Sequence, residues 1–424
     1  MAGYDNRLRP VLNYSSSVNI TLRMNLYQIL DVNEPNQNIV LYLWLTQMWR
    51  DEFLAWDPDQ YDGIDWVVIP WENIWLPDTY LYNSLVMSRD SSERWISAIA
   101  KSDGQIRFMY PAIFTVSCKL NIRFFPFDEQ NCTLEFGSWT SDITALNFFP
   151  ESEQIPKENF VTNEEWEVKS FRMYRHEVLF ECCPNAWVQL KAHLMLQRKP
   201  LFYIVNLIIP TAIICMVSIF GFFTPSTSSG ERTERVNLGI TTLLAMAILL
   251  LMVSDSMPTT SDFIPLIGWF LLDIIILISA GTLTTSAVIC IHRRGIYGHK
   301  ISKPVKRFLT GRFPKLIGVP PPATLAIAWR TEKGTTRLTS KQTEVIAKLN
   351  RKENGELDHL VKAGTEMALE SDFEVNSEQR ENLLLEYEYF ANVLDRIFLI
   401  LYMLALILVC FGVISVGLMY QYVV

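Results

Sequence analysis

The sequence has 424 residues, of which 50% are hydrophobic and only 19% are charged, and its net charge is −8. This balance suggests a chain that is part soluble and part membrane-spanning. The 5 histidines show no paired metal-ligand spacing, and no glycine-rich phosphate loop or nucleophile motif is found. These absences argue against an enzyme, so we expect no catalytic residue, no metal ligand and no cofactor.

The first two hundred residues have the pattern of short strands. Apolar and polar residues alternate in Lys119–Phe124 and again in Val188–His193, and turn clusters interrupt such runs at fairly regular intervals. We therefore expect residues 1–200 to form an antiparallel β-sandwich of about ten strands, with a short helix at Tyr4–Leu12 before them.

Four apolar segments are long enough to cross a hydrocarbon core of about 30 Å. They are Leu201–Phe223, Val236–Val253, Phe263–Ile291 and Ile397–Tyr420. We expect a multi-domain membrane protein, in which the sandwich is followed by a four-helix transmembrane bundle. Residues 201–291 would hold transmembrane helices 1–3, and residues 396–424 helix 4 and an extracellular C-terminus.

Residues 292–395 are expected to form a partly helical cytoplasmic segment. The stretch Ser340–Asp395 is helix-rich by composition, and its end predicts an amphipathic helix that continues without a break into the last span. The stretch Pro314–Arg330 is expected to be disordered.

Charge sets the expected orientation. Between Arg293 and Lys315 there are 8 basic residues and no acidic one, which predicts that the third span ends in the cytoplasm. Topology thus explains this basic run better than nucleic-acid binding does. Residues 1–200 would then lie outside, where 26 acidic and 17 basic residues could concentrate cations near a pore or simply maintain solubility.

Three glycosylation sequons agree with this orientation, because all precede the first span. Their acceptors are Asn13, Asn19 and Asn131. We expect a multi-pass protein of the plasma membrane, in contact with membrane lipid, whose N-terminal domain is extracellular.

The segment Glu234–Pro258 predicts a helix with an ordered stripe on one face. The stripe contains Glu234, Asn237, Thr241, Leu244, Ile248, Met252 and Asp255. Polar groups inside hydrocarbon are costly unless they face water or protein. Several copies around an axis would form a pore, with charged rings at its mouths and an apolar constriction at Leu244 and Ile248. The alternative is one membrane helix that packs its small residues against neighbours.

Four cysteines fall in the outer region, where disulfides persist and three connectivities are possible. Cys118 and Cys132 enclose thirteen residues with the tip Phe125-Pro126-Phe127-Asp128. An aromatic tip that carries one carboxylate suggests docking onto a membrane-proximal surface. This loop resembles the signature of the Cys-loop, or pentameric ligand-gated, receptor superfamily.

Further motifs resemble the nicotinic acetylcholine receptor branch and cover the whole chain except roughly Gly311–Lys341. They are Trp49–Trp56, Trp75–Tyr82, Gly137–Thr140, Cys182-Cys183, Gln197-Arg198, Met257-Pro258 and Ser261–Ile267. The resemblance implies disulfides Cys118–Cys132 and Cys182–Cys183, and assembly with four further subunits in a pentamer around a cation pore. A postsynaptic location is one candidate that follows from it.

The resemblance also implies an agonist site between subunits. A quaternary ammonium has no N–H to donate and is best held by aromatic faces. The implied principal face contains Tyr82, Trp139, Phe180, Cys182, Cys183 and Trp187. The implied complementary face contains Trp49, Arg107 and Met109. The alternative is that the tryptophans belong to the sandwich core.

Two departures from the family pattern concern the ligand. Phe180 and Trp187 stand where the family usually has tyrosine, and Arg107 either points to solvent or binds a carboxylate. An aromatic cage with an arginine resembles the betaine- or choline-responsive branch known in nematodes. The resemblance therefore favours betaine as agonist, followed by choline or acetylcholine.

The resemblance implies two further roles. Asp128 and Arg198 would form an ion pair, and Phe127 and Pro126 would rest against the linker Pro258–Pro265. Glu234 would form a carboxylate ring that passes sodium, potassium and, as a further candidate, calcium. The competing hypothesis is an accessory subunit that needs other nicotinic-like subunits to form a functional receptor.

Overall fold

The computed structural model describes residues 3–86, 96–224, 229–258, 263–297, 301–327, 329 and 361–423. The chain divides into two compact units, which are described separately below. The first comprises Met1–Asn206, Leu251–Trp269 and Val413–Val424, and the second comprises Leu207–Leu250 and Phe270–Gly412.

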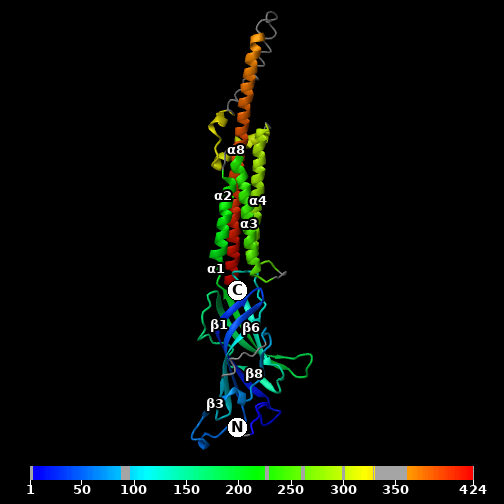
Figure 1. Cartoon of the computed structure of the whole chain (residues 1–424), viewed down its shortest axis with the longest axis vertical. Coiled ribbons are helices and arrows are strands. Elements are labelled where there is room, and N and C mark those ends of the chain that lie inside the picture. Colours follow the sequence, from blue (N-terminus) through cyan, green and yellow to red (C-terminus); the bar gives the residue numbers. More distant parts are fainter. Residues whose placement is uncertain are drawn as a thin grey trace. The chain divides into compact units, whose positions relative to one another are not determined.

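Ten strands in the described part of the first unit form two sheets (Figure 1). They are β1 (Val18–Asn33), β2 (Asn38–Arg50), β3 (Trp66–Pro70), β4 (Thr79–Leu81), β5 (Ser97–Lys101), β6 (Gln105–Ser117), β7 (Glu129–Ser138), β8 (Leu146–Pro150), β9 (Trp166–Val178) and β10 (Trp187–Arg198). The six-stranded sheet has the order β3-β5-β6-β2-β1-β8, and the four-stranded sheet has the order β4-β7-β10-β9. Short 3₁₀ turns lie at Pro58–Gln60 and Trp71–Asn73.

Strand periodicity explains why the two sheets pack together. In β1 the side chains of Val18, Ile20 and Leu22 are at most 3% exposed, whereas Asn19 and Arg23 point outward. Successive side chains of a strand point to opposite faces, so one face of β1 is apolar and the other is polar. The apolar faces of both sheets form one hydrophobic core. The predicted sandwich is therefore confirmed.

One pairing departs from the antiparallel expectation. β8 pairs with β1 in parallel, with Leu146 opposite Val18 and Pro150 opposite Leu22. The chain reaches β8 from β7, which belongs to the other sheet. A hairpin forces antiparallel pairing, but a connection that crosses between sheets does not.

The alternating stretch Lys119–Phe124 is not a strand, contrary to expectation. Side-chain amides bind its backbone: the N–H of Leu120 donates to Gln37 Oε1 at 2.7 Å and that of Asn121 to Gln130 Oε1 at 2.8 Å. These hydrogen bonds replace those of a strand ladder. The alternation of apolar and polar residues therefore reflects which side chains of this loop are buried.

Tyr4–Leu12 contains turns but no helix, so that expectation is also wrong. The Tyr4 hydroxyl donates to Asp51 Oδ2 at 2.6 Å and accepts the Trp75 N–H at 3.0 Å. Long-range bonds of this kind hold the segment in an irregular path that the local sequence does not specify.

The helices of the described chain follow the strands. They are α1 (Leu201–Tyr203), α2 (Ile209–Phe223), α3 (Ser229–Asp255), α4 (Leu266–Ile296), α5 (Lys303–Leu309), α6 (Phe313–Leu316) and α8 (Val361–Val423). A π-helical turn at Ile204–Ile208 joins α1 to α2 just before Pro210, whose missing N–H cannot continue the hydrogen-bond ladder.

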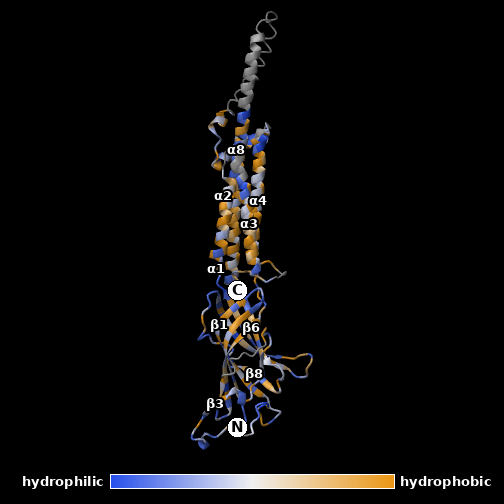
Figure 2. Cartoon of the chain, viewed as in Figure 1, coloured by the Kyte–Doolittle hydropathy of each residue, from blue (hydrophilic) through white to orange (hydrophobic). Residues whose placement is uncertain are grey.

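Four helical segments are long and apolar enough to cross a membrane. They are Leu201–Phe223, Glu234–Asp255, Leu266–Gly295 and Arg380–Gln421. Figure 2 shows hydrophobic residues concentrated along α2, α3, α4 and α8. The four predicted spans are therefore confirmed, and α8 runs unbroken from the cytoplasmic segment into the last of them, as expected.

The segment after α4 is ordered where disorder was expected. In the described part of Pro314–Arg330, Leu325 and Trp329 are buried against Tyr389 of α8. The Trp329 indole N–H also donates to Glu386 Oε1 at 2.5 Å. Two large apolar side chains therefore hold a proline-rich stretch that has little local propensity for structure.

A buried ion pair joins α3 to α8 in the second unit. Arg235 Nη1 lies 3.1 Å from Asp395 Oδ2, and the two side chains are 7% and 2% exposed. The same guanidinium donates to the carbonyl oxygens of Phe222 and Thr224 at the end of α2. A single cation thus connects three of the four spanning helices.

Replacing Asp395 by Ala should destabilise the second unit, because it removes the carboxylate that lies 3.1 Å from a buried guanidinium. Breaking a buried pair on one side costs about 3–5 kcal/mol. We expect a clear fall in the melting temperature of the detergent-solubilised protein, followed by fluorescence-detected size-exclusion chromatography. Glu381→Ala changes an exposed carboxylate of the same helix and should leave the melting temperature unchanged. Equal effects of the two variants would contradict the structural role of the pair.

Candidate functional site

Aromatic rings gather at one end of the four-stranded sheet. The ring centroids of Tyr82 and Trp139 lie 5.7 Å apart, and Tyr80 lies 5.3 Å from Trp139. The Trp139 side chain is 64% exposed, so its indole face is open to a ligand rather than part of the core. The Tyr82 hydroxyl donates to the carbonyl oxygen of Ser138, which fixes that ring beside the indole.

Asp78 holds the segment that carries Trp139. Its carboxylate accepts hydrogen bonds from the Ser138 hydroxyl at 2.7 Å and from the Thr140 hydroxyl at 2.7 Å. The Thr140 N–H donates to the same carboxylate at 2.9 Å. The position of the exposed indole is therefore set on both sides by one carboxylate.

The hairpin between β9 and β10 carries the second pair of predicted rings. Phe180 and Trp187 lie 5.9 Å apart in an edge-to-face arrangement, and Phe180 is 37% exposed. The structure contains the Cys182–Cys183 disulfide at the tip of this hairpin. Such a bond between neighbouring residues restricts the backbone of the tip.

The sheet ladder brings the two ring pairs to the same end. Gln189, two residues after Trp187, lies opposite Gly137, two residues before Trp139. The Ile143 N–H donates a hydrogen bond of 2.9 Å to the Ala186 carbonyl oxygen, which joins the hairpin to the segment after Trp139. The structure therefore places all four predicted aromatic residues at this end, and it adds Tyr80.

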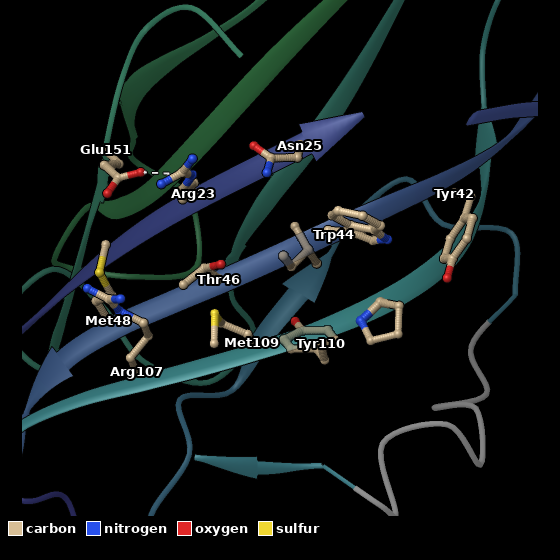
Figure 3. Close-up of a pocket in the computed structure, with 12 residues that line it drawn as sticks. Arg23, Asn25, Tyr42, Trp44, Thr46, Met48, Arg107, Met109, Tyr110 and Glu151 are labelled. Carbon is tan, nitrogen blue, oxygen red and sulfur yellow. Dashed lines mark ion pairs between the residues drawn. The ribbon is translucent and has the colours of Figure 1, made fainter. Parts of the chain in front are cut away.

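The outward face of the six-stranded sheet forms a pocket of about 550 Å³ (Figure 3). It is lined by Arg23, Asn25, Tyr42, Trp44, Leu45, Thr46, Met48, Arg107, Met109, Tyr110, Pro111 and Glu151. β1, β2 and β6 supply most of these residues, and Glu151 follows β8. Arg107 and Met109, both predicted, lie in this pocket.

The predicted complementary tryptophan was misplaced. Trp49 is only 3% exposed and packs in the core, with its ring 5.9 Å from that of Trp75. Trp44, five residues earlier on β2, is 36% exposed and lines the pocket beside Met109. An odd separation along a strand puts the two rings on opposite faces. The alternation of β2, in which Leu41, Leu43 and Leu45 share the Trp49 face, could have revealed this.

Tyr80 was also missed by sequence reasoning. It lies on β4, and Tyr82 follows directly after that strand, two residues later, so strand alternation directs the two rings to the same face. Their centroids lie 6.4 Å apart. The signal was therefore present in the spacing of the two tyrosines.

A caged arginine lies at the end of β10, where α1 follows. Arg198 is fully buried and its Nε lies 2.9 Å from Asp128 Oδ1. Two further carboxylates, of Glu34 and Glu165, bind the same guanidinium. Burial disfavours the charge, but the charges and hydrogen bonds of Asp128 and Glu34 outweigh it and raise the pKa of Arg198.

Aromatic rings complete this cage. The guanidinium carbon lies 4.2 Å from the centroid of Trp166, 4.7 Å from that of Phe125 and 5.7 Å from that of Tyr203. Cation–π contacts of this kind are strongest where water is excluded. Arg198 thus stays charged in the interior, and the predicted pair with Asp128 is part of a larger cluster.

The loop closed by the Cys118–Cys132 disulfide contacts other parts of the first unit. The carbonyl oxygen of Arg123 accepts a hydrogen bond from the Leu266 N–H at 2.9 Å. The guanidinium carbon of Arg123 lies 5.2 Å from the centroid of the Phe263 ring. These contacts involve Phe263 of the linker before α4 and the first residue of α4, on either side of the predicted Pro265. Part of that linker, residues 259–262, lies outside the described residues.

The same loop also meets the end of α8. The rings of Phe124 and Tyr420 stack with centroids 4.0 Å apart. Phe127 lies directly against Gly417, where an added Cβ would be 2.2 Å from the Phe127 ring. Only glycine can occupy this position with the ring as placed.

All seven residues of the predicted stripe on α3 are exposed in this chain. They are Glu234, Asn237, Thr241, Leu244, Ile248, Met252 and Asp255. By contrast, Arg235, Thr242 and Met246 are at most 7% exposed. One side of the helix is therefore packed against its neighbours, and the stripe is left uncovered.

The sequon asparagines Asn13, Asn19 and Asn131 are exposed as well. Their side chains are accessible for modification.

Comparison with known proteins agrees with this geometry. A model of the neurotransmitter-gated ion-channel ligand-binding domain matches residues 1–200, and one of the transmembrane region of the same channels matches residues 207–384. The two matches correspond to the sandwich and to the helical part.

Individual relatives include nematode and vertebrate receptors. The acetylcholine receptor subunit alpha-type deg-3 of Caenorhabditis elegans is 51% identical over 328 residues, 75% of this chain and 58% of that protein. The betaine receptor acr-23 of the same organism is 37% identical over 80% of this chain and 67% of its own length. The neuronal acetylcholine receptor subunit alpha-6 of Gallus gallus is 35% identical over 80% of this chain and 68% of its own length.

The chain spans 58% of the length of deg-3 and similar shares of other nematode relatives. The matched segments nevertheless include both the ligand-binding and the transmembrane regions. These relatives are receptors and not enzymes. The chain therefore belongs to the neurotransmitter-gated ion-channel family, among its nicotinic acetylcholine receptor-type subunits.

Proposed function

We propose that this chain is a subunit of a pentameric cation channel that opens when a quaternary-ammonium agonist binds between adjacent subunits. The observation that carries the proposal is that one chain presents two separate exposed aromatic surfaces. One is the end of the four-stranded sheet around Trp139, and the other is the pocket around Trp44. Each surface offers only part of an enclosure, so two neighbouring subunits would complete it.

Cation–π attraction supports a quaternary ammonium as the ligand. Phe180 and Trp187 offer no phenolic hydroxyl, and the Tyr82 hydroxyl is already bonded to Ser138. Such walls suit a cation that cannot donate hydrogen bonds.

The complementary pocket supports betaine over choline or acetylcholine. Arg107 is exposed on the pocket wall, and it has no carboxylate partner among the described residues. A guanidinium can bind a carboxylate in a fork, and betaine carries a carboxylate where choline carries a hydroxyl. The name of acr-23, a betaine receptor, is consistent with this preference.

We further propose that the exposed stripe of α3 lines the pore. Glu234 would form a carboxylate ring that favours cations, and Leu244 and Ile248 would form the apolar gate. The agonist opens the gate only to the extent that it binds the open state more tightly. The Arg198 cage and the Cys118–Cys132 loop would transmit the change.

Expression of this chain alone, with current recording during application of betaine, choline and acetylcholine, tests the proposal. Trp139→Ala should raise the half-maximal agonist concentration roughly thirtyfold, because a desolvated cation–π contact is worth about 2 kcal/mol. Trp66→Ala removes another exposed indole, on β3, and should have no effect. No current from well-expressed surface protein, or equal shifts in both variants, would refute the assignment.

Leu244→Thr should move the agonist response to lower concentrations, because a polar side chain wets an apolar constriction and favours the open state. Concentration–response curves measure the shift. Leu243→Thr makes the same chemical change at a half-buried position next to it and should leave the response much closer to that of the parent. Unchanged agonist sensitivity in Leu244→Thr would mean that this residue is not the gate.

Gly417→Ala should impair opening without impairing binding, because its methyl group would overlap the Phe127 ring. We expect a smaller maximal current at unchanged affinity for a competitive antagonist. Phe127→Leu, which removes ring atoms, should partly restore the response of Gly417→Ala. Gly412→Ala, where an added Cβ meets nothing within 4 Å, is the control. Loss of antagonist affinity would instead indicate general misfolding.

A further inference from the structure

The pocket of Figure 3 contains a second guanidinium. Arg23 lies on β1 opposite Thr46 of β2, and Thr46 in turn lies opposite Met109 of β6. Figure 3 shows Arg23 and Arg107 toward one end of the pocket and Trp44 and Tyr42 toward the other. The pocket therefore has a basic end and an aromatic end.

Arg23 is already paired, whereas Arg107 has no carboxylate partner in the part of the chain that the structure describes. The Arg23 Nε lies 3.3 Å from Glu151 Oε2, and the two side chains are 43% and 39% exposed. The backbone of Glu151 is fixed beside β1, because its N–H donates to the Leu22 carbonyl at 3.0 Å. Glu151 is thus held in place next to the arginine, whereas the pair itself faces solvent.

Such a pair can exchange its carboxylate at little cost. Exposed ion pairs contribute little net stability, since water solvates both partners nearly as well. Two guanidinium groups and one carboxylate also leave this end of the pocket with a net positive charge. A ligand that brings one carboxylate would neutralise it.

We propose that Arg23 is a specificity-determining residue that binds the carboxylate of a zwitterionic ammonium agonist together with Arg107. Glu151 occupies Arg23 in the absence of ligand and competes with the ligand carboxylate for it. The inference rests on the proposed agonist site and names its ligand class, a trimethylammonium carboxylate. Arg23 thereby favours such a zwitterion over an alcohol such as choline, and Glu151 limits that preference.

Betaine and choline are the matched probes, because they share the trimethylammonium group and differ in carboxylate and hydroxyl. Glu151→Gln should lower the half-maximal betaine concentration about two- to fivefold and leave that of choline unchanged. Arg23→Gln should raise the betaine value by a similar factor and leave choline unchanged. In the Arg23→Gln background, Glu151→Gln should not lower the half-maximal betaine concentration further, because the guanidinium for which the two carboxylates compete is no longer present. Glu153→Gln changes a nearby exposed carboxylate outside the pocket and should alter neither response.

Currents and competition binding on solubilised protein should be measured in parallel, so that a variant with poor opening still reports affinity. The inference is overturned if Glu151→Gln shifts betaine and choline by the same factor, or if its gain persists without Arg23. It is also overturned if choline opens or binds the wild-type protein but betaine does neither, and the proposed function then stands. If no quaternary ammonium binds or opens the wild-type protein, the proposed function fails and this inference fails with it.

Discussion

The buried guanidinium of Arg198 is the constraint around which the end of the first unit that precedes α1 is built. A charge without water is tolerated only when it is paired and hydrogen-bonded, and three carboxylates and three rings meet this need. They come from separate segments: the turn after β1, the disulfide-closed loop, the approach to β9 and α1. Each segment must therefore keep its position for the cation to remain satisfied. Removing any one carboxylate would disturb the others.

This arrangement gives the proposed coupling a physical route. β10 carries Trp187 at one end and Arg198 at the other, so a movement of the hairpin that holds Cys182–Cys183 reaches the cage along a single strand. At the cage, Asp128 belongs to the loop whose Phe124 and Phe127 contact α8. In the proposed mechanism, agonist binding shifts an equilibrium between two arrangements of these contacts.

The proposed agonist site and the proposed pore share one feature. In both, large apolar side chains whose burial would stabilise a single chain are left exposed. They are Trp44, Trp139 and Met109 on the sheets, and Leu244 and Ile248 on α3. The opposite sides of the same elements are fully packed, through the sandwich core and through Arg235, Thr242 and Met246. Exposed apolar surface of this kind marks a contact with other molecules. Neighbouring subunits and permeating water are the contacts that the proposed function supplies.

The sequence by itself determined the elements whose signal is local. Period-two alternation predicted the strands of the sandwich, apolar length predicted the four spans, and helical spacing predicted which side of α3 is uncovered. The aromatic residues Tyr82, Trp139, Phe180 and Trp187 were also found from motifs, and the structure brings them to one end of a sheet.

Only the tertiary structure decided the matters that depend on partners far away in the sequence. It showed that Trp49 is in the core while Trp44 faces outward, that β8 joins β1 in parallel, and that side-chain amides rather than a strand hold Lys119–Phe124. It also placed Glu151 on Arg23, and Glu34 and Glu165 beside Asp128 on Arg198. The physical reason is that periodicity records which side of an element is buried, whereas the partner of a charge or ring depends on how separate segments meet.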